Sequence, residues 1–155
     1  MDEVIRVLHV DDDPDICSVT ALHLESVADD FSVETTTDPN GVLSLLAAEP
    51  VDCLVSDFDM PGMNGLELLE SVRADYPDLP FILLTGKGSE EIASKAIGAG
   101  VTGYLQKDTG TEQYELLANR IRNAVDRNRS KGALAESQRR LEMLLDQSPL
   151  AVVEG

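Results

Sequence analysis

Short apolar runs rich in β-branched residues alternate along this chain with longer segments of helical periodicity. This alternation is typical of a parallel β-sheet covered by helices, because each connection between parallel strands needs a crossover helix. We therefore expect an α/β fold with five strand–helix pairs. The five runs predicted to be strands are Val4–Val10, Phe31–Thr36, Cys53–Ser56, Phe81–Leu84 and Thr102–Leu105.

Helix start signals lie between these runs. Asp13 and Asp38 each stand directly before a proline, which places a capping carboxylate ahead of a residue suited to the first helical position. Ser89 and Thr111 each precede glutamate, whose negative charge is favourable at the N-terminal end of a helix dipole. Four helices are predicted to begin at these positions.

The last predicted helix is longer than one domain needs. Its apolar stripe continues through the basic residues 120–140 and beyond, with charged residues between the apolar ones. We interpret 1–127 as a globular domain, 128–147 as a helical linker interrupted or flexed near Gly132, and 148–155 as a tail. Such a linker can pair with a second helix, which predicts a homodimer through the C-terminal helix. A loose tail is the alternative.

Composition excludes several classes of protein. The 155 residues carry a formal net charge of -17, which disfavours direct binding to nucleic acid or anionic lipid. No apolar stretch is long enough to span a membrane, and the first residues are acidic where a secretory signal is basic, so we expect a cytoplasmic protein. Cys17 and Cys53 form no metal-binding or disulfide pattern and are interpreted as packing residues.

The charge is distributed unevenly. Residues 1–119 contain 24 acidic and 5 basic side chains, whereas residues 120–140 contain 7 basic and 2 acidic ones. So large an acidic excess suits a protein that stays hydrated in concentrated salt, where self-repulsion is screened. We expect a halophilic source, with an acidic mesophilic protein as the alternative.

Polar residues follow the predicted strands, at the position where ligands collect in open parallel sheets. Several carboxylates brought together there would repel one another unless a cation lies among them. Oxygen ligands indicate a hard ion, and a small number of carboxylates favours Mg²⁺ over Ca²⁺. A lysine and a threonine beside such a site are suited to donate to phosphoryl oxygens. The residues concerned are Asp11, Asp12, Asp13, Asp57, Asp59, Thr85 and Lys107.

Four linked motifs give the chain a specific resemblance to a known family. They are Val10–Pro14, Val55–Gly65, Leu84–Gly86 and Tyr104–Lys107. In order and spacing they resemble the receiver domain of two-component response regulators, over roughly residues 4–127. The resemblance implies a flavodoxin-like, doubly wound parallel sheet in the strand order 2-1-3-4-5, here with a C-terminal helical extension.

The resemblance also implies a chemical role for the acidic cluster. Asp57 would be the phosphoacceptor, attacking the phosphohistidine of a partner histidine kinase or phosphotransfer protein. Asp12 would bind Mg²⁺ directly and Asp11 through water, and the carboxylate of Asp57 and the backbone carbonyl of Asp59 would complete the metal site. Lys107 would pair with the phosphoryl group. No multiple-turnover activity is expected, and any kinase activity would lie in a missing C-terminal part.

A switch is implied in the same way. Thr85 would turn toward the phosphoryl group by hydrogen bond, and Tyr104 would rotate into the space that Thr85 leaves. This rotation would reshape the face formed by the fourth helix, fifth strand and fifth helix, through which such domains usually meet their partners.

Two stretches qualify the resemblance. Asp108 stands where most receivers have a proline after the lysine, which puts the loop geometry after the fifth strand in doubt. Near the C-terminus, Leu141–Val153 is similar to the opening of a PAS sensor domain, which often follows a receiver and a helical linker. The chain is then expected to be a fragment or a truncated form of a larger sensor or regulator.

Three other interpretations were weighed. Asp57 and Asp59 match the DxD motif of haloacid-dehalogenase-type phosphatases, but that motif belongs after the first strand of its domain, and here it follows the third. A receiver-like protein that only dimerises is disfavoured by the intact Asp57, Thr85 and Lys107. His9 has the proline spacing of a kinase phosphoacceptor histidine, but it lies in a predicted buried strand.

Overall fold

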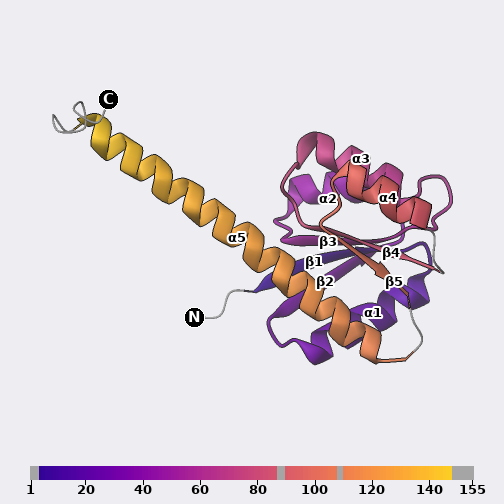
Figure 1. Ribbon diagram of the computed structural model, residues 1–155. Helices are drawn as coiled ribbons and strands as arrows, with labels where there is room; N and C mark the ends of the chain where they lie inside the picture. Colours follow the sequence, from indigo (N-terminus) through magenta and orange to yellow (C-terminus); the bar gives the residue numbers. More distant parts are fainter. Residues whose placement is uncertain (1–3, 87–89, 108–109, 148–155) are drawn as a thin grey trace. The chain divides into compact units, whose positions relative to one another are not determined.

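Five parallel strands form one sheet in the order β2-β1-β3-β4-β5, which confirms the predicted topology (Figure 1). The computed structural model describes residues 4–86, 90–107 and 110–147, with side chains as far as residue 129. The strands are β1 Ile5–Val10, β2 Phe31–Thr36, β3 Cys53–Asp57, β4 Phe81–Thr85 and β5 Gly103–Gln106. Each observed strand end lies within one residue of the predicted one.

Helices cover both faces of the sheet. The helices are α1 Pro14–Val27, α2 Val42–Ala48, α3 Gly65–Asp75, α4 Glu90–Ala99 and α5 Glu112–Gln147. The first helix and the first part of α5 lie on one face, and α2, α3 and α4 lie on the other (Figure 1).

Two of the predicted helix caps, Asp13 and Asp38, are observed. Asp13 accepts a hydrogen bond from the backbone N–H of Asp15 at 2.9 Å, and α1 begins at Pro14 as predicted. Asp38 caps in the same way, but the turn after it is a 3₁₀ helix, η1 Pro39–Gly41, and α2 follows only at Val42. Ser89 lies outside the described residues.

Alternate residues of β1 divide the core into two halves. Ile5 and Val7 pack with Leu24 and Ile121 on the face covered by α1 and α5. Leu8 and Val10 belong to the cluster on the opposite face. Because both faces are covered, β1, β3 and β4 are almost entirely buried and mainly apolar, as expected for a parallel sheet with helices on both sides.

The first part of α5 is tied to the start of β2. Both terminal nitrogens of Arg122 donate to the carboxylate of Asp30 at 2.7 Å, and the guanidinium lies 5.2 Å from the ring centroid of Phe31. A two-pronged arginine–carboxylate contact of this kind fixes direction as well as distance. The helix that carries Leu117 and Ile121 is thereby held on its face of the sheet.

Strand β5 is the shortest and least buried of the five. It has four residues, none of them fully buried, and it pairs with β4 alone. It is therefore an edge strand on the side of the sheet opposite β2.

The chain beyond Val125 forms a separate unit, Asp126–Gly155. Helix α5 continues through Gly132, where the sequence analysis expects an interruption, and ends at Gln147. The predicted tail 148–155, which contains part of the PAS-like stretch, lies outside the described residues. None of the described helices combines the length and the hydropathy that crossing a membrane requires.

Candidate functional site

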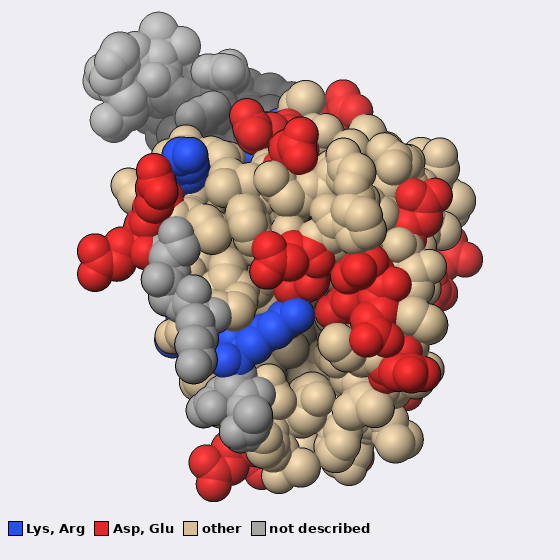
Figure 2. Space-filling model, turned by 90° about the vertical axis from the view of Figure 1, so that its right-hand side faces the viewer, with Lys and Arg blue, Asp and Glu red and all other residues tan. Residues whose placement is uncertain are grey.

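The residues singled out after each strand meet at one edge of the sheet. Asp11 directly follows β1, Asp57 is the last residue of β3, and Thr85 is the last residue of β4. Lys107 follows β5, and its backbone N–H donates to the carbonyl of Thr85 at 2.7 Å. Figure 2 shows acidic side chains gathered around an elongated basic side chain on the side of the molecule that lies to the right in Figure 1.

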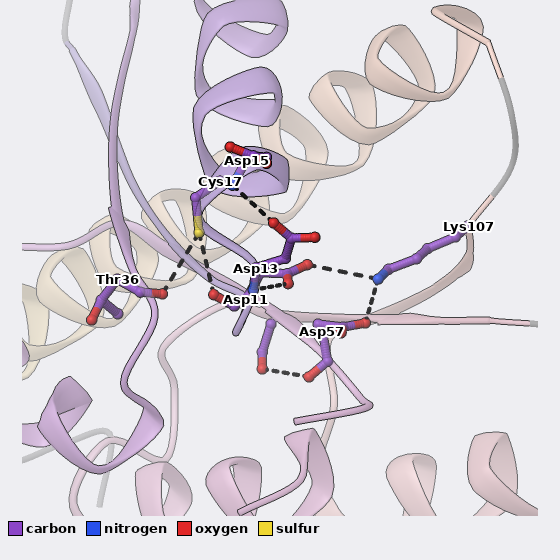
Figure 3. A network of polar contacts seen from close by, with 8 residues as sticks. Asp11, Asp13, Asp15, Cys17, Thr36, Asp57 and Lys107 are labelled. Atoms are coloured by element: carbon purple, nitrogen blue, oxygen red, sulfur yellow. Dashed lines mark hydrogen bonds and ion pairs between the residues drawn. The ribbon is translucent and has the colours of Figure 1, made fainter. Parts of the chain in front are cut away.

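Lys107 links the two buried carboxylates of the site. Its Nζ lies 2.6 Å from Oδ1 of Asp57 and 3.7 Å from Oδ2 of Asp11 (Figure 3). Both carboxylates are almost inaccessible to solvent, whereas about a third of the Lys107 side chain is exposed. The lysine therefore partly neutralises two negative charges that burial has separated from water.

Three carboxylates of this edge can share one cation. Asp11, Asp12 and Asp57 each offer a ligand oxygen, and these atoms all lie within 4.8 Å of one another. Asp12 is exposed whereas the other two are buried, so the group has one side open to solvent and substrate. An all-oxygen set with an open side suits Mg²⁺, which usually keeps water and phosphate oxygens among its ligands.

The electrostatics of the site follow from burial and pairing. Burial raises the pKa of Asp57, and the ion pair with Lys107 opposes that rise. Burial also raises the pKa of Asp11, and the backbone N–H of Asp13 opposes the rise by donating to Oδ1 of Asp11 at 2.9 Å. Burial alone would lower the pKa of Lys107, but its pairing with Asp57 and Asp11 outweighs this and raises it. The lysine thus stays charged, whereas burial makes ionisation of the two carboxylates less favourable.

Helix α1 is held against the site by a cysteine. The thiol of Cys17 lies 3.3 Å from the backbone carbonyl oxygen of Asp11 and 3.8 Å from that of Thr36 (Figure 3). The sequence pattern predicts only a packing role for Cys17. Its polar contact depends on the end of β2, which lies far away in the sequence, so no local signal could have revealed it.

Gly65 allows the loop after β3 to return to the sheet. Its backbone N–H donates to the carbonyl of Phe58 at 2.9 Å. A Cβ atom added at Gly65 would lie 2.5 Å from the backbone oxygen of Asp57 and 2.5 Å from a methyl carbon of Leu83. The neighbouring Asn64 begins α3 with a capping box formed with Glu67. The glycine is thus needed for the backbone geometry of the predicted phosphoacceptor.

The two predicted switch residues are in contact. Thr85 Oγ1 and the phenol oxygen of Tyr104 are hydrogen-bonded at 3.0 Å, and the Tyr104 side chain is half-buried against the core cluster beneath α3 and α4. Asp59 is exposed two residues after Asp57. Asp108, on which the geometry of the following loop depends, lies outside the described residues.

His9 is fully buried in β1, as the sequence analysis expects. Neither ring nitrogen has a hydrogen-bond partner among the described residues. Burial, and secondarily the charge of Lys107, lower the pKa of His9 to about 4. Such a side chain has neither the exposure nor the helical setting of a kinase phosphoacceptor histidine.

Curated proteins are similar to this chain in sequence. The chain is 33% identical over 147 residues to the C4-dicarboxylate transport transcriptional regulatory protein DctD of Rhizobium meliloti, covering 93% of this chain and 32% of that protein. It is 30% identical over 116 residues to the nitrogen assimilation regulatory protein NtrX of Azorhizobium caulinodans, covering 74% and 25%. The chain thus spans about a quarter to a third of these two relatives.

Solved structures share the fold. A CheY-like response regulator receiver domain protein from Methanospirillum hungatei matches with a TM-score of 0.73 and 27% identity, over 83% of this chain and 99% of that one. The beryllofluoride-activated NtrC4 receiver domain dimer matches with a TM-score of 0.69 and 28% identity, over 79% and 98%. These comparisons give no support to the haloacid-dehalogenase-type phosphatase.

The family model for the response regulator receiver domain matches residues 7–120, which include all four sequence motifs and every residue of the site described above. The chain therefore belongs to the response regulator receiver domain family.

Proposed function

We propose that this chain is a phosphoacceptor switch in which Asp57 takes a phosphoryl group from a phosphohistidine. The observation that carries the proposal is the geometry around Asp57: a buried carboxylate, 2.6 Å from the ammonium of Lys107, whose ligand oxygen lies within 4.8 Å of those of Asp11 and Asp12. A nucleophile, a counter-ion for phosphoryl oxygens and a set of metal ligands are thus collected in one place.

In the proposed transfer, a carboxylate oxygen of Asp57 attacks phosphorus and the bond from phosphorus to the donor's imidazole nitrogen breaks. The electron pair of that bond stays on the nitrogen, and an aspartyl phosphate forms. The carboxylate must be ionised to attack, and Lys107 supports the charged form against the effect of burial.

Mg²⁺ would be held by the carboxylates of Asp11, Asp12 and Asp57 and by the backbone carbonyl of Asp59. When bound, it supplies charge that offsets the negative charge gathered on the phosphoryl oxygens. Lys107 supplies the protein's own positive charge at the same place, because its Nζ already contacts the nucleophile.

The signal would leave the site through Thr85 and Tyr104. A phosphoryl group on Asp57 gives Thr85 a strong new acceptor, and its hydroxyl is hydrogen-bonded to Tyr104 at the start. Any reorientation of Thr85 therefore changes the environment of Tyr104 on β5. We infer that the output surface is the face formed by α4, β5 and α5.

The partners follow from the proposed chemistry and from the relatives. The phosphodonor would be a histidine kinase or phosphotransfer protein in the cytoplasm. The two relatives described above are named as regulatory proteins, and this chain spans only part of each. We infer a homodimer through the C-terminal helix; the beryllofluoride-activated NtrC4 receiver domain, which this chain resembles, is itself a dimer.

Intact mass spectrometry after incubation with acetyl phosphate and Mg²⁺ tests the function. We expect one phosphoryl adduct on the wild-type chain and none on Asp57→Asn. The matched control is Asp59→Asn, which keeps the backbone carbonyl and should still be phosphorylated. Loss of the adduct in Asp59→Asn alone would point instead to a catalytic role for that carboxylate.

The acidic composition supports a second part of the proposal, adaptation to concentrated salt. With 29 acidic and 12 basic residues, the chain repels itself at low ionic strength, and screening by salt reduces that repulsion. We expect the melting temperature to keep rising with KCl concentration, even at concentrations where charge–charge repulsion in ordinary proteins is already fully screened. A melting temperature that is unchanged between low and high KCl would contradict a halophilic source.

A further inference from the structure

A cavity of about 500 Å³ lies between the sheet and the two helices α1 and α5. Its walls come from three strands and two helices: His9 from β1, Leu84 from β4, Leu105 from β5, Thr20 from α1 and Leu117 from α5. It reaches the phosphoacceptor edge, where Asp11 and Lys107 belong to its lining.

His9 is the unusual member of this lining. The side chain has no solvent exposure, and both of its ring nitrogens lack a hydrogen-bond partner among the described residues. Buried polar groups are normally hydrogen-bonded, because leaving one unsatisfied costs free energy. The residues that share its face of β1, Ile5 and Val7, are apolar core residues, so packing alone does not require an imidazole there.

The cavity has the size and character of a small-molecule site. Such sites are commonly about 300–1,000 Å³, mostly apolar, with few polar groups that fix orientation. Leucines form much of the wall here, and His9 and Thr20 provide buried polar atoms. An imidazole presents at least one N–H donor in either protonation state. The ring nitrogens of His9 have almost no accessible surface in this structure, so the ring must turn toward the cavity before a bound oxygen can accept a hydrogen bond from it.

The charges that line the cavity disfavour an anion. Asp11 and Glu112 are acidic, and the one lining ammonium, on Lys107, is already paired with Asp57 and Asp11. A neutral molecule avoids both the repulsion and the competition for Lys107.

We propose that this cavity binds a small, neutral, mainly apolar molecule carrying a hydroxyl group, which hydrogen-bonds to His9 once the imidazole has turned toward the cavity, and that its occupancy changes the rate of phosphorylation at the adjoining edge. The binding depends only on the cavity. The effect on rate rests on the proposed phosphoacceptor function, because Asp11 and Lys107 are shared by the cavity and the site. Coupling of this kind is reciprocal for the two binding free energies.

Titration of the full 155-residue chain with phenol, followed by ¹H–¹⁵N NMR, tests the binding. Toluene is the matched probe, with the same ring and no oxygen. We expect saturable shifts at amides of cavity residues such as Leu105 and Leu117, and binding of phenol roughly fivefold to tenfold tighter than that of toluene, the value of one net hydrogen bond. Shifts that rise linearly without saturation, or that spread over unrelated surfaces, would overturn the site.

Two variants localise the effect. His9→Leu should abolish the preference for phenol over toluene, and Thr20→Met should weaken both probes by filling the cavity. If His9→Leu does not fold, Thr20→Met still tests the site. Undiminished phenol binding in Thr20→Met would show that phenol binds elsewhere and would overturn the proposal.

Phosphorylation from acetyl phosphate, with and without saturating phenol, tests the coupling. Coupling is supported if phenol changes the phosphorylation rate of the wild type and this change is lost in Thr20→Met. Coupling is overturned if phenol binds saturably and the phosphorylation rate stays the same. Absence of any adduct without phenol would instead contradict the phosphoacceptor function, and the NMR result would still judge the binding site on its own.

Discussion

The hydroxyl of Thr85 is hydrogen-bonded to the phenol oxygen of Tyr104 across 3.0 Å, between the last residue of β4 and the second residue of β5. A hydroxyl can donate one hydrogen bond and accept others. In the structure Thr85 donates to Tyr104. Because the tyrosine hydroxyl can also donate, Thr85 can give its proton to a new acceptor at the phosphoacceptor edge and accept a bond from Tyr104 instead. The contact provides a direct physical link from the site to a half-buried aromatic ring.

The first prediction concerns this link. In Thr85→Val the branched shape is kept and the hydroxyl is lost, so phosphorylation should no longer shift the ring resonances of Tyr104. Thr85→Ser should keep the shift. Selective ¹³C labelling of tyrosine rings measures this, and the spectrum is simple because the chain has only 3 tyrosines. An unchanged Tyr104 response in Thr85→Val would show that the signal passes by another route.

The second prediction concerns Lys107. Lys107→Met leaves the buried carboxylates of Asp57 and Asp11 without their shared counter-ion. Removal of one partner of a fully buried pair commonly costs about 3–5 kcal/mol, and the partial exposure of Lys107 reduces the expected loss to about 1–3 kcal/mol of unfolding free energy. Urea denaturation in metal-free buffer measures it.

Added Mg²⁺ should recover part of that loss, because the same carboxylates would bind the cation. Lys95→Met is the control: Lys95 is exposed on α4, and its replacement should change stability by less than about 0.5 kcal/mol. Equal effects of the two substitutions would contradict the counter-ion role.

The third prediction is a pH dependence that comes from His9. Its pKa is lowered to about 4 in the folded chain from 6.5, so between these values the unfolded state binds more protons. The contribution of the neutral buried imidazole is complete above pH 6.5 and is lost as the pH falls toward 4. The loss amounts to about 3 kcal/mol at most.

Unfolding free energies of the wild type and His9→Leu should therefore diverge progressively on acidification, in metal-free buffer. Asp11 and Asp57 titrate in both proteins, with raised pKa values that act in the opposite direction, so the difference between the two curves isolates His9. Parallel curves from neutral pH to pH 4.5 would contradict the assignment.

The fourth prediction concerns the close approach at Gly65. The Cβ of Gly65→Ala would overlap the backbone of Asp57 and the side chain of Leu83, so we expect a loss of about 1–3 kcal/mol in stability and slower phosphorylation. Gly98→Ala is the matched control, since nothing lies within 4 Å of its Cβ position in α4. Alanine there should stabilise the chain by about 0.5–1 kcal/mol. Thermal melts and the acetyl phosphate reaction measure both effects.

The sheet was predictable because its determinants are local. Apolar runs bounded by turn residues identify strands, and parallel strands necessarily bring their carboxyl ends to one edge. Asp11, Asp57, Thr85 and Lys107 could therefore be placed together before any distance was known. The start of α1 was predictable for the same reason, because Asp13 and Pro14 lie next to each other in the chain.

Other features depend on tertiary contacts that no local pattern encodes. The 3₁₀ turn after Asp38 was expected to be α-helical, but the short segment before Val42 ends in Gly41, a poor helix former. The contact of Cys17 with two carbonyl oxygens needs the ends of β1 and β2 side by side. The close approach of Gly65 to Asp57 likewise appears only when the loop after β3 has folded back.

The position of β5 has a mechanical consequence. The strand pairs with β4 alone, yet it carries Tyr104, which is hydrogen-bonded to Thr85, and leads directly into Lys107, which contacts Asp57. Displacing an edge strand breaks hydrogen bonds to one neighbouring strand only, whereas displacing β1 or β3 would break hydrogen bonds on both sides and disrupt the packing of both core clusters. Tyr104 and Lys107 are thus carried by, or directly follow, the strand whose movement costs the fewest hydrogen bonds and core contacts.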